Sequence, residues 1–184
     1  MYSYLLGSIP FGVILIKFFL NKDLKDIGSG NIGATNVLRS GKKYLGFFTL
    51  LFDTLKAYIA VIITYKYFGD YIFLSGLLCF LGHIFPVWLK FKGGKGVAVF
   101  LGVLFAISIK FGLIFVVCWC SILYLTKYSS ISSLMSTGII FLYSVYLKNF
   151  PENIFFFIIF IIIIYTHREN IARLKNKTEN KTNL

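Results

Sequence analysis

The chain of 184 residues is 58% hydrophobic and 19% aromatic, and it carries a formal net charge of +12. Its mean hydropathy of +0.80 excludes an ordinary soluble domain, because the helices and strands of such a domain need a polar side. The three cysteines, Cys79, Cys118 and Cys120, lie within apolar runs and show neither a disulfide framework nor a zinc spacing. The composition therefore predicts an integral membrane protein.

Apolar runs without charge, such as 154–165, predict helices rather than barrel strands, because they lack an alternation of apolar and polar residues. Seven such segments follow one another: 2–20, 44–68, 71–89, 97–109, 111–126, 130–147 and 153–166. We expect an all-α, polytopic helix bundle of about seven transmembrane helices, forming a single domain over 1–184. Because 97–109 is shorter than the roughly 20 residues that a crossing needs, five spans plus a re-entrant pair is the alternative.

Positive charge follows the first apolar segment, which draws that end into the cytoplasm and leaves the N-terminus outside. Seven crossings then place the C-terminus inside, with the cytoplasmic segments 21–43, 90–96 and 167–184. Together with Lys17 and Lys127, these segments hold 15 of the 19 Lys and Arg residues. The outside turns hold Lys66, Lys110 and Lys148. Basic residues confined to short loops argue for membrane topology and against a nucleic-acid partner.

The first cytoplasmic segment contains GSGNIGATNVLR at residues 28–39. Three of its glycines have the GxGxxG spacing, but no βαβ unit fits around them, so a dinucleotide site is not expected. Glycines let the backbone approach a ligand closely, and a nest of N–H groups near an arginine suits a phosphate. A flexible membrane loop is the alternative. The candidate residues are Gly28, Ser29, Gly30, Asn31, Gly33, Asn36 and Arg39.

The second cytoplasmic segment, KFKGGKG at 90–96, places three lysines among three glycines. It lacks the spacing of a Walker A loop. An apolar helix is expected to begin at Val97, so the loop would present helix-terminal N–H groups to an anion. A topological anchor needs the lysines but does not explain the glycines. The candidate residues here are Lys92, Gly93, Gly94, Lys95 and Gly96.

The third cytoplasmic segment begins with HRENIARL at 167–174. If the helix of the last span continues, His167 and Asn170 share a face, and Glu169 pairs with Arg173. A histidine at a membrane exit titrates near neutrality and suits proton transfer. A structural role is the alternative, because a lone histidine is more often structural.

Two charged residues and one histidine lie well inside the predicted spans. Asp53 and Lys56, at i and i+3, predict an ion pair that faces the bundle interior and supports it. His83 is expected to pack or to form a hydrogen bond, and Pro86 is expected to bend the third span.

The three loops together resemble the bacterial acyl-phosphate:glycerol-3-phosphate acyltransferase family (PlsY type). GSGNIGATNVLR at 28–39, HIFPVWLKFKGGKGVAV at 83–99 and HRENIARLKNKTE at 167–179 are similar to its three motifs, in the same order. GSIPFG at 7–12 and FDTLK at 52–56 match as well. Lys177 departs from the pattern, because a glycine usually stands at this position.

The resemblance implies that an acyl group passes from acyl phosphate to the 1-hydroxyl of sn-glycerol 3-phosphate, giving lysophosphatidate and phosphate. It implies catalytic roles for Ser29, Arg39 and His167, a glycerol 3-phosphate site at residues 93–96, and a functional Asn170. Glu179 is expected to be structural. We expect a monomer in the bacterial plasma (inner) membrane, with the two small-molecule substrates and membrane lipid as partners, and with no metal or other cofactor.

The alternative function is a membrane transporter for an anionic, phosphate-bearing solute. Such a protein predicts charge and broken helices near the bilayer midplane. Apart from Asp53, Lys56 and His83, the charged residues and histidines of this sequence collect in the loops and at the ends of the apolar segments instead, which favours the acyltransferase.

Overall fold

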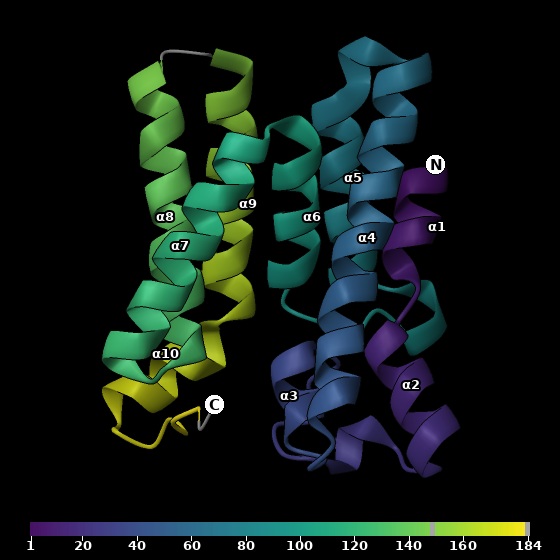
Figure 1. Cartoon of the computed structure of the whole chain (residues 1–184), viewed down its shortest axis with the longest axis vertical. Helices are drawn as coiled ribbons and strands as arrows, with labels where there is room; N and C mark the ends of the chain where they lie inside the picture. Colours follow the sequence, from purple (N-terminus) through teal and green to yellow (C-terminus); the bar gives the residue numbers. More distant parts are fainter. Residues whose placement is uncertain (148–149, 183–184) are drawn as a thin grey trace. The chain divides into compact units, whose positions relative to one another are not determined.

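The computed structural model describes residues 1–147 and 150–182. Within these residues the chain is helical and contains no strand, as the all-α prediction requires (Figure 1). It divides into two compact units, Met1–Ile107 and Ser108–Leu184, which are described separately. Lys148, assigned above to an outside turn, lies outside the described residues.

The first unit consists of α1 (Tyr2–Ser8), α2 (Phe11–Leu20), α3 (Ala34–Leu38), α4 (Lys43–Tyr67), α5 (Ile72–Ile84) and α6 (Val97–Ile107). Three short 3-10 turns connect some of these helices: η1 (Leu24–Asp26), η2 (Gly69–Tyr71) and η3 (Val87–Leu89). The second unit consists of α7 (Ile109–Thr126), α8 (Ser129–Leu147), α9 (Phe150–Thr166) and α10 (Arg168–Lys175). All seven predicted apolar segments are therefore helical.

Among the described residues, length and composition allow five stretches to cross a membrane: Tyr2–Leu20, Lys43–Tyr67, Gly69–Leu89, Ile109–Thr126 and Ser129–Leu147. The bent pair Pro151–Thr166 and Arg168–Lys175 raises this number to six. With 11 residues, α6 is only about 16 Å long, roughly half the thickness of a hydrocarbon core. The seven crossings and the outside N-terminus stay predictions.

Two prolines mark where helices stop. The first span is divided between α1 and α2 at Ile9 and Pro10, because proline lacks an N–H and disfavours a helical residue before it. The prediction that Pro86 bends a continuous helix in the third span is wrong. Instead α5 ends at Ile84, and Phe85 has a non-helical ψ of 59°. Both interruptions free backbone carbonyls: that of Ile9 accepts a hydrogen bond from Lys56 on α4, and those of His83 and Ile84 accept from the following loop.

In the first unit, α4 packs against α1, α2, α3, α5 and α6, and α1 packs against α5 (Figure 1). Small residues bring α1 and α5 close together. A Cβ on Gly7 would overlap the carbonyl oxygen of Cys79, and one on Gly82 would overlap that of Tyr4. Lipid is as apolar as the side chains, so close packing between small residues is what holds membrane helices together.

The second unit is a succession of antiparallel neighbours, in which α7 packs against α8 and α8 packs against α9. Hydroxyl groups line the buried side of α8: Ser130, Ser132, Ser133, Ser136, Thr137 and Ser144. The indole N–H of Trp119 on α7 donates to Ser133 Oγ at 3.1 Å. Hydrogen bonds of this kind join helices in lipid, where water is not available as a partner.

Candidate active site

The first loop, residues 21–42, is organised around the side chain of Asn36, which is 3% exposed. Asn36 Oδ1 accepts hydrogen bonds from the backbone N–H of Ser29 at 2.9 Å and from Ser29 Oγ at 3.2 Å. Its Nδ2 donates to the carbonyl oxygens of Ile27 and Asn31, both at 2.8 Å. The amide therefore closes the glycine-rich turn on itself and determines its shape.

Arg39 lies over the start of this turn. Gly28 and Gly30 have φ values of 54° and 69°, a region that favours glycine. A Cβ on Gly28 would lie 2.6 Å from Arg39 Cδ and 3.3 Å from its Nη1. Ser29 and Arg39 are both exposed. The loop thus presents a hydroxyl and a guanidinium close together, a combination suited to phosphate oxygens.

The remaining candidates of this loop begin the short helix α3. Asn31 Oδ1 accepts a hydrogen bond from the N–H of Gly33 at 3.0 Å, and Gly33 is the N-cap of α3. This turn directs the chain into the helix that carries Asn36 and that Arg39 caps at its C-terminal end. The two ends of the motif are therefore brought together by local backbone geometry.

An apolar cluster lies beneath the loop and anchors it to the helices. Its buried members are Ile16, Leu24, Ile32, Val37 and Leu45. Leu89, from the end of the third span, packs against the same cluster. The indole N–H of Trp88 also donates to Ser8 Oγ at 2.8 Å. The first loop and the segment leading into the second loop therefore share one support within the first unit.

The second loop, residues 90–96, folds back on the end of α5. The N–H of Gly93 donates to the carbonyl of Ile84 at 2.9 Å, and that of Gly94 donates to the carbonyl of His83 at 3.0 Å. These carbonyls are acceptors that a helix end leaves unpaired. The contacts fix two of the three glycines to the helix.

The loop then enters α6, which begins at Val97 as predicted. Gly96 has a φ of 86°, and its carbonyl accepts a hydrogen bond from the N–H of Phe100 at 2.7 Å. Lys92 is exposed and Lys95 is half-buried. The N–H groups of the first turn of α6 follow directly, so the positive end of a helix dipole adjoins the lysines.

The predicted ion pair in the second span is present. Lys56 Nζ lies 2.6 Å from Asp53 Oδ1, and each side chain is 2% exposed. Lys56 Nζ also lies 3.1 Å from His83 Nδ1. This agrees with the hydrogen-bonding role expected for His83, although no local pattern identifies Lys56 as its partner.

In the second unit, the third motif begins where the last span bends. The helix does not run straight through His167, because α9 and α10 meet at an angle of 58°. His167 is 3% exposed and Asn170 is 6% exposed. His167 Nδ1 lies 2.9 Å from the carbonyl oxygen of Ile163, which can only accept. The ring proton of the neutral histidine therefore lies on Nδ1, and the lone pair lies on Nε2.

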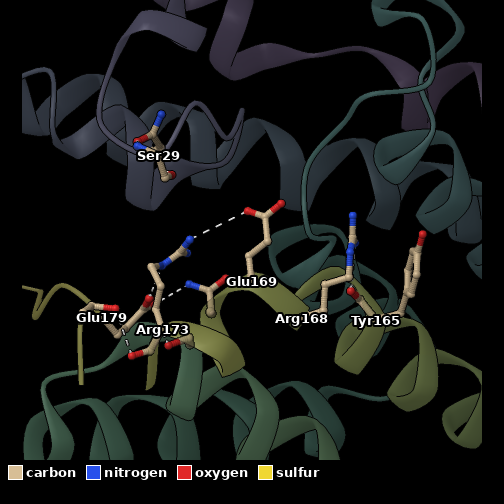
Figure 2. Close-up of polar contacts among 10 residues, drawn as sticks. Ser29, Tyr165, Arg168, Glu169, Arg173 and Glu179 are labelled. Atoms are coloured by element: carbon tan, nitrogen blue, oxygen red, sulfur yellow. Dashed lines mark hydrogen bonds and ion pairs between the residues drawn. The ribbon is translucent and has the colours of Figure 1, made fainter. Parts of the chain in front are cut away.

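The carboxylate of Glu179 connects residues of α8 and α10 (Figure 2). Its carboxylate accepts hydrogen bonds from Ser130 Oγ at 2.9 Å, Asn170 Nδ2 at 2.5 Å and Arg173 Nε at 2.7 Å. Partial burial raises the pKa of Glu179, but these hydrogen bonds and the charge of Arg173 outweigh it and hold the pKa below its usual value. The predicted Glu169–Arg173 pair also forms, at 3.8 Å.

The candidate residues thus form three local groups. The first unit holds the group around Asn36, with Ser29 and Arg39, and the group of Gly93–Gly96 on the end of α5. The second unit holds His167, Asn170 and Glu179. Sequence reasoning missed Ser130 as a partner of Glu179. The density of hydroxyl residues in 129–137 is the signal that could have indicated polar contacts on this helix.

Comparison with known proteins identifies the class. Residues 1–177 match the sequence profile of the glycerol-3-phosphate acyltransferase family. A glycerol-3-phosphate acyltransferase of Pelagibacter ubique (strain HTCC1062) is 56% identical over 182 residues, covering 99% of this chain and 95% of the relative.

Two crystal structures of PlsY (YgiH), an integral membrane glycerol 3-phosphate acyltransferase, share the fold. The glycerol 3-phosphate form superposes with a TM-score of 0.92 at 40% identity, covering 99% of this chain and 92% of that one. The lysophosphatidic acid form gives a TM-score of 0.88 at 39% identity, covering 98% and 91%.

The fold and its polar loops define an integral membrane enzyme built of helices. The chain belongs to the glycerol-3-phosphate acyltransferase family, which confirms the resemblance drawn from the three motifs.

Proposed function

We propose that this chain transfers an acyl group from acyl phosphate to the 1-hydroxyl of sn-glycerol 3-phosphate, releasing lysophosphatidate and phosphate. The observation that carries the proposal is the match over nearly the whole chain to an enzyme described in glycerol 3-phosphate and lysophosphatidic acid forms. These two molecules are the acceptor and the product of the proposed reaction.

The chemistry is a single displacement at a carbonyl carbon. The 1-hydroxyl oxygen of glycerol 3-phosphate attacks the acyl carbon, the bond from this carbon to the phosphate oxygen breaks, and inorganic phosphate leaves. The hydroxyl proton passes to a base. Because an acyl phosphate is already an activated mixed anhydride, no covalent enzyme intermediate is needed.

Two phosphate groups must approach each other despite their repulsion, and the first unit supplies positive charge for both. We assign Ser29 and Arg39 to one phosphate, with Gly28, Gly30, Asn31, Gly33 and Asn36 shaping the turn. The glycerol 3-phosphate site is the second loop, in which Lys92 and Lys95 supply positive charge and Gly93, Gly94 and Gly96 shape the backbone around the phosphate. Fixed donors and charges lower the barrier by orienting the reactants and stabilising developing charge.

His167 is the proposed general base, and Asn170 is the residue that orients substrate beside it. The hydrogen bond between His167 Nδ1 and the carbonyl of Ile163 supports this role, because it leaves the basic lone pair on Nε2. Asp53, Lys56 and Glu179 hold the structure. The enzyme acts as a monomeric single domain, with 21–43, 90–96 and 167–184 at the cytoplasmic face and the acyl chain in lipid.

The test uses the purified chain in detergent with palmitoyl phosphate and radiolabelled glycerol 3-phosphate. Lysophosphatidate and inorganic phosphate should form in equal amounts, and palmitoyl-CoA should not replace the acyl phosphate. Product with palmitoyl-CoA alone would overturn the donor assignment. No product with either donor, but uptake of glycerol 3-phosphate into proteoliposomes, would show a transporter instead.

A further inference from the structure

Packing alone does not explain the ion pair inside the second span. Asp53 and Lys56 have side chains that are each 2% exposed. Charged groups at such depth are costly, and a well-packed apolar pair is often as stable as a buried ion pair. A bundle that required only cohesion would be served by leucine at both positions. The contacts of Lys56 indicate what the charges are for.

The ammonium group of Lys56 has three donors, and three acceptors lie around it. Asp53 Oδ1 is at 2.6 Å, the carbonyl oxygen of Ile9 is at 2.7 Å, and His83 Nδ1 is at 3.1 Å. The carbonyl of Ile9 belongs to the break that Pro10 makes in the first span. Lys56 therefore joins the first span to the third and fixes the imidazole of His83.

The far side of that imidazole lies against the second loop. Because Nδ1 accepts from Lys56, the ring proton lies on Nε2, the atom nearest to Gly94. A Cβ on Gly94 would overlap Nε2 and would lie 2.9 Å from both Cδ2 and Cε1. The main chain of His83 contacts the same residue, since its carbonyl accepts the hydrogen bond from the N–H of Gly94 at 3.0 Å.

We propose that His83, oriented by Lys56 and Asp53, is a positioning residue that sets the conformation of the Gly93–Gly96 loop and thereby its affinity for the phosphate of glycerol 3-phosphate. The inference rests on the proposed function, which assigns this loop to that substrate. It accounts for a glycine at position 94, because the ring occupies the volume of a side chain there. It also accounts for the ion pair, because the imidazole needs a buried donor to hold its orientation.

A double-variant cycle between His83→Ala and Gly94→Ala tests the contact directly. Each single variant should raise the KM and the Kd for glycerol 3-phosphate, His83→Ala by loosening the loop and Gly94→Ala by collision with the ring. In the double variant the added methyl group enters the space that the ring leaves. Its KM for glycerol 3-phosphate should be about fivefold or more below the product of the two single effects, as expected for residues in contact.

Gly96→Ala provides the matched control. A Cβ on Gly96 lies 2.8 Å from Phe80 Cζ and 2.9 Å from Phe80 Cδ2, and the residue has a φ of 86°. Removing the ring of His83 relieves neither the contact nor the backbone conformation. The effects of His83→Ala and Gly96→Ala should therefore multiply. Equal coupling in both cycles, or none in the Gly94 cycle, would overturn the proposal.

Lys56→Met and Lys56→Arg distinguish positioning from a purely structural role. Loss of the ammonium group should raise the KM for glycerol 3-phosphate while the KM for acyl phosphate and the kcat of the folded enzyme stay within about twofold, and Lys56→Arg should recover part of the loss. A lower apparent kcat with unchanged KM would overturn the proposal. If Lys56→Met does not fold, the His83 and Gly94 cycle still decides. A wild-type chain that makes no lysophosphatidate would instead contradict the proposed function, and the Kd for glycerol 3-phosphate would then report the coupling.

Discussion

The two units hold their polar motifs by different means. In Met1–Ile107 the loops are held by neutral hydrogen bonds and by shape. The Asn36 amide closes the first loop, N–H groups of the second loop donate to helix-end carbonyls, and glycines stand where a Cβ would overlap a neighbour. In Ser108–Leu184 the third motif is held by one carboxylate, that of Glu179, which accepts three hydrogen bonds. The first arrangement should be sensitive to added volume, and the second should be sensitive to charge and pH.

The largest expected effect tests whether the chemistry of the second unit differs from that of the first. His167→Ala removes the proposed base, so kcat should fall by about 100-fold or more while the KM for glycerol 3-phosphate changes little. Steady-state kinetics with palmitoyl phosphate measures both values. The thermal unfolding temperature of the variant shows whether the fold is kept.

A near-normal kcat with a raised KM would assign His167 to substrate binding. A substrate phosphate would then be the acceptor of the proton, and both units would contribute substrate binding rather than a catalytic base.

In the first unit, Arg39→Lys should act on affinity. The planar guanidinium binds two phosphate oxygens at once, and an ammonium group does not, so the KM for a phosphate-bearing substrate should rise about tenfold. Arg168→Lys is the matched control in the second unit. The guanidinium of Arg168 lies 4.5 Å from the centre of the Tyr165 ring and donates to the carbonyl of Tyr165 at 3.1 Å (Figure 2).

Kinetics of the two variants side by side, with each substrate varied in turn, measure the difference. The Arg168→Lys values should stay within about twofold of wild type, because its guanidinium is engaged by its own helix end. An equal rise in KM in both variants would show that Arg39 acts through its positive charge alone rather than through the planar geometry of its guanidinium.

Glu179→Gln tests the charge dependence of the second unit. The neutral amide turns an NH₂ group toward other donors, so the free energy of unfolding should fall by about 1–3 kcal/mol. Glu169→Gln should change it far less, because Glu169 is 72% exposed and lies 3.8 Å from Arg173. Thermal unfolding in detergent at pH 7 compares the two variants.

The same pair gives a pH dependence with a defined sign. The pKa of Glu179 is held below its ordinary value of 4.5 in the folded chain, so its contribution is complete above that value and is lost as the pH falls through the folded pKa. The difference in unfolding temperature between wild type and Glu179→Gln should therefore shrink on acidification below about pH 4.5. A difference that is constant down to pH 3 would contradict a stabilising role for the negative charge of Glu179.

Most of the fold followed from the sequence because the apolar segments are long and their boundaries carry charge. The contacts inside the site followed less well. The sequence predicts Asn36 as a residue of the phosphate site but not that its amide is bonded to its own loop. The partnership of His83 with Lys56 joins residues 27 positions apart, and only the packing of α4 against α5 brings them together. Local patterns identify residue types at a loop, whereas partners on other helices require the tertiary structure.

The smallest expected effect concerns the turn that brings Glu179 back. Lys177 has a φ of 59°, its N–H donates to the carbonyl of Leu174 at 3.1 Å, and that of Thr178 donates to Arg173 at 2.8 Å. These are the two hydrogen bonds of a Schellman motif, whose left-handed position favours glycine. Lys177→Gly should raise the free energy of unfolding by about 1 kcal/mol.

Lys177→Ala separates backbone conformation from charge, because alanine removes the ammonium group but keeps the Cβ that makes the left-handed region unfavourable. Its unfolding temperature should stay close to that of wild type while that of Lys177→Gly rises. In the Glu179→Gln background the gain in the free energy of unfolding from Lys177→Gly should shrink, because the turn then positions a side chain that makes weaker hydrogen bonds. An equal gain in both backgrounds would mean that the turn stabilises α10 alone, and the second unit would be held by shape as well as by charge.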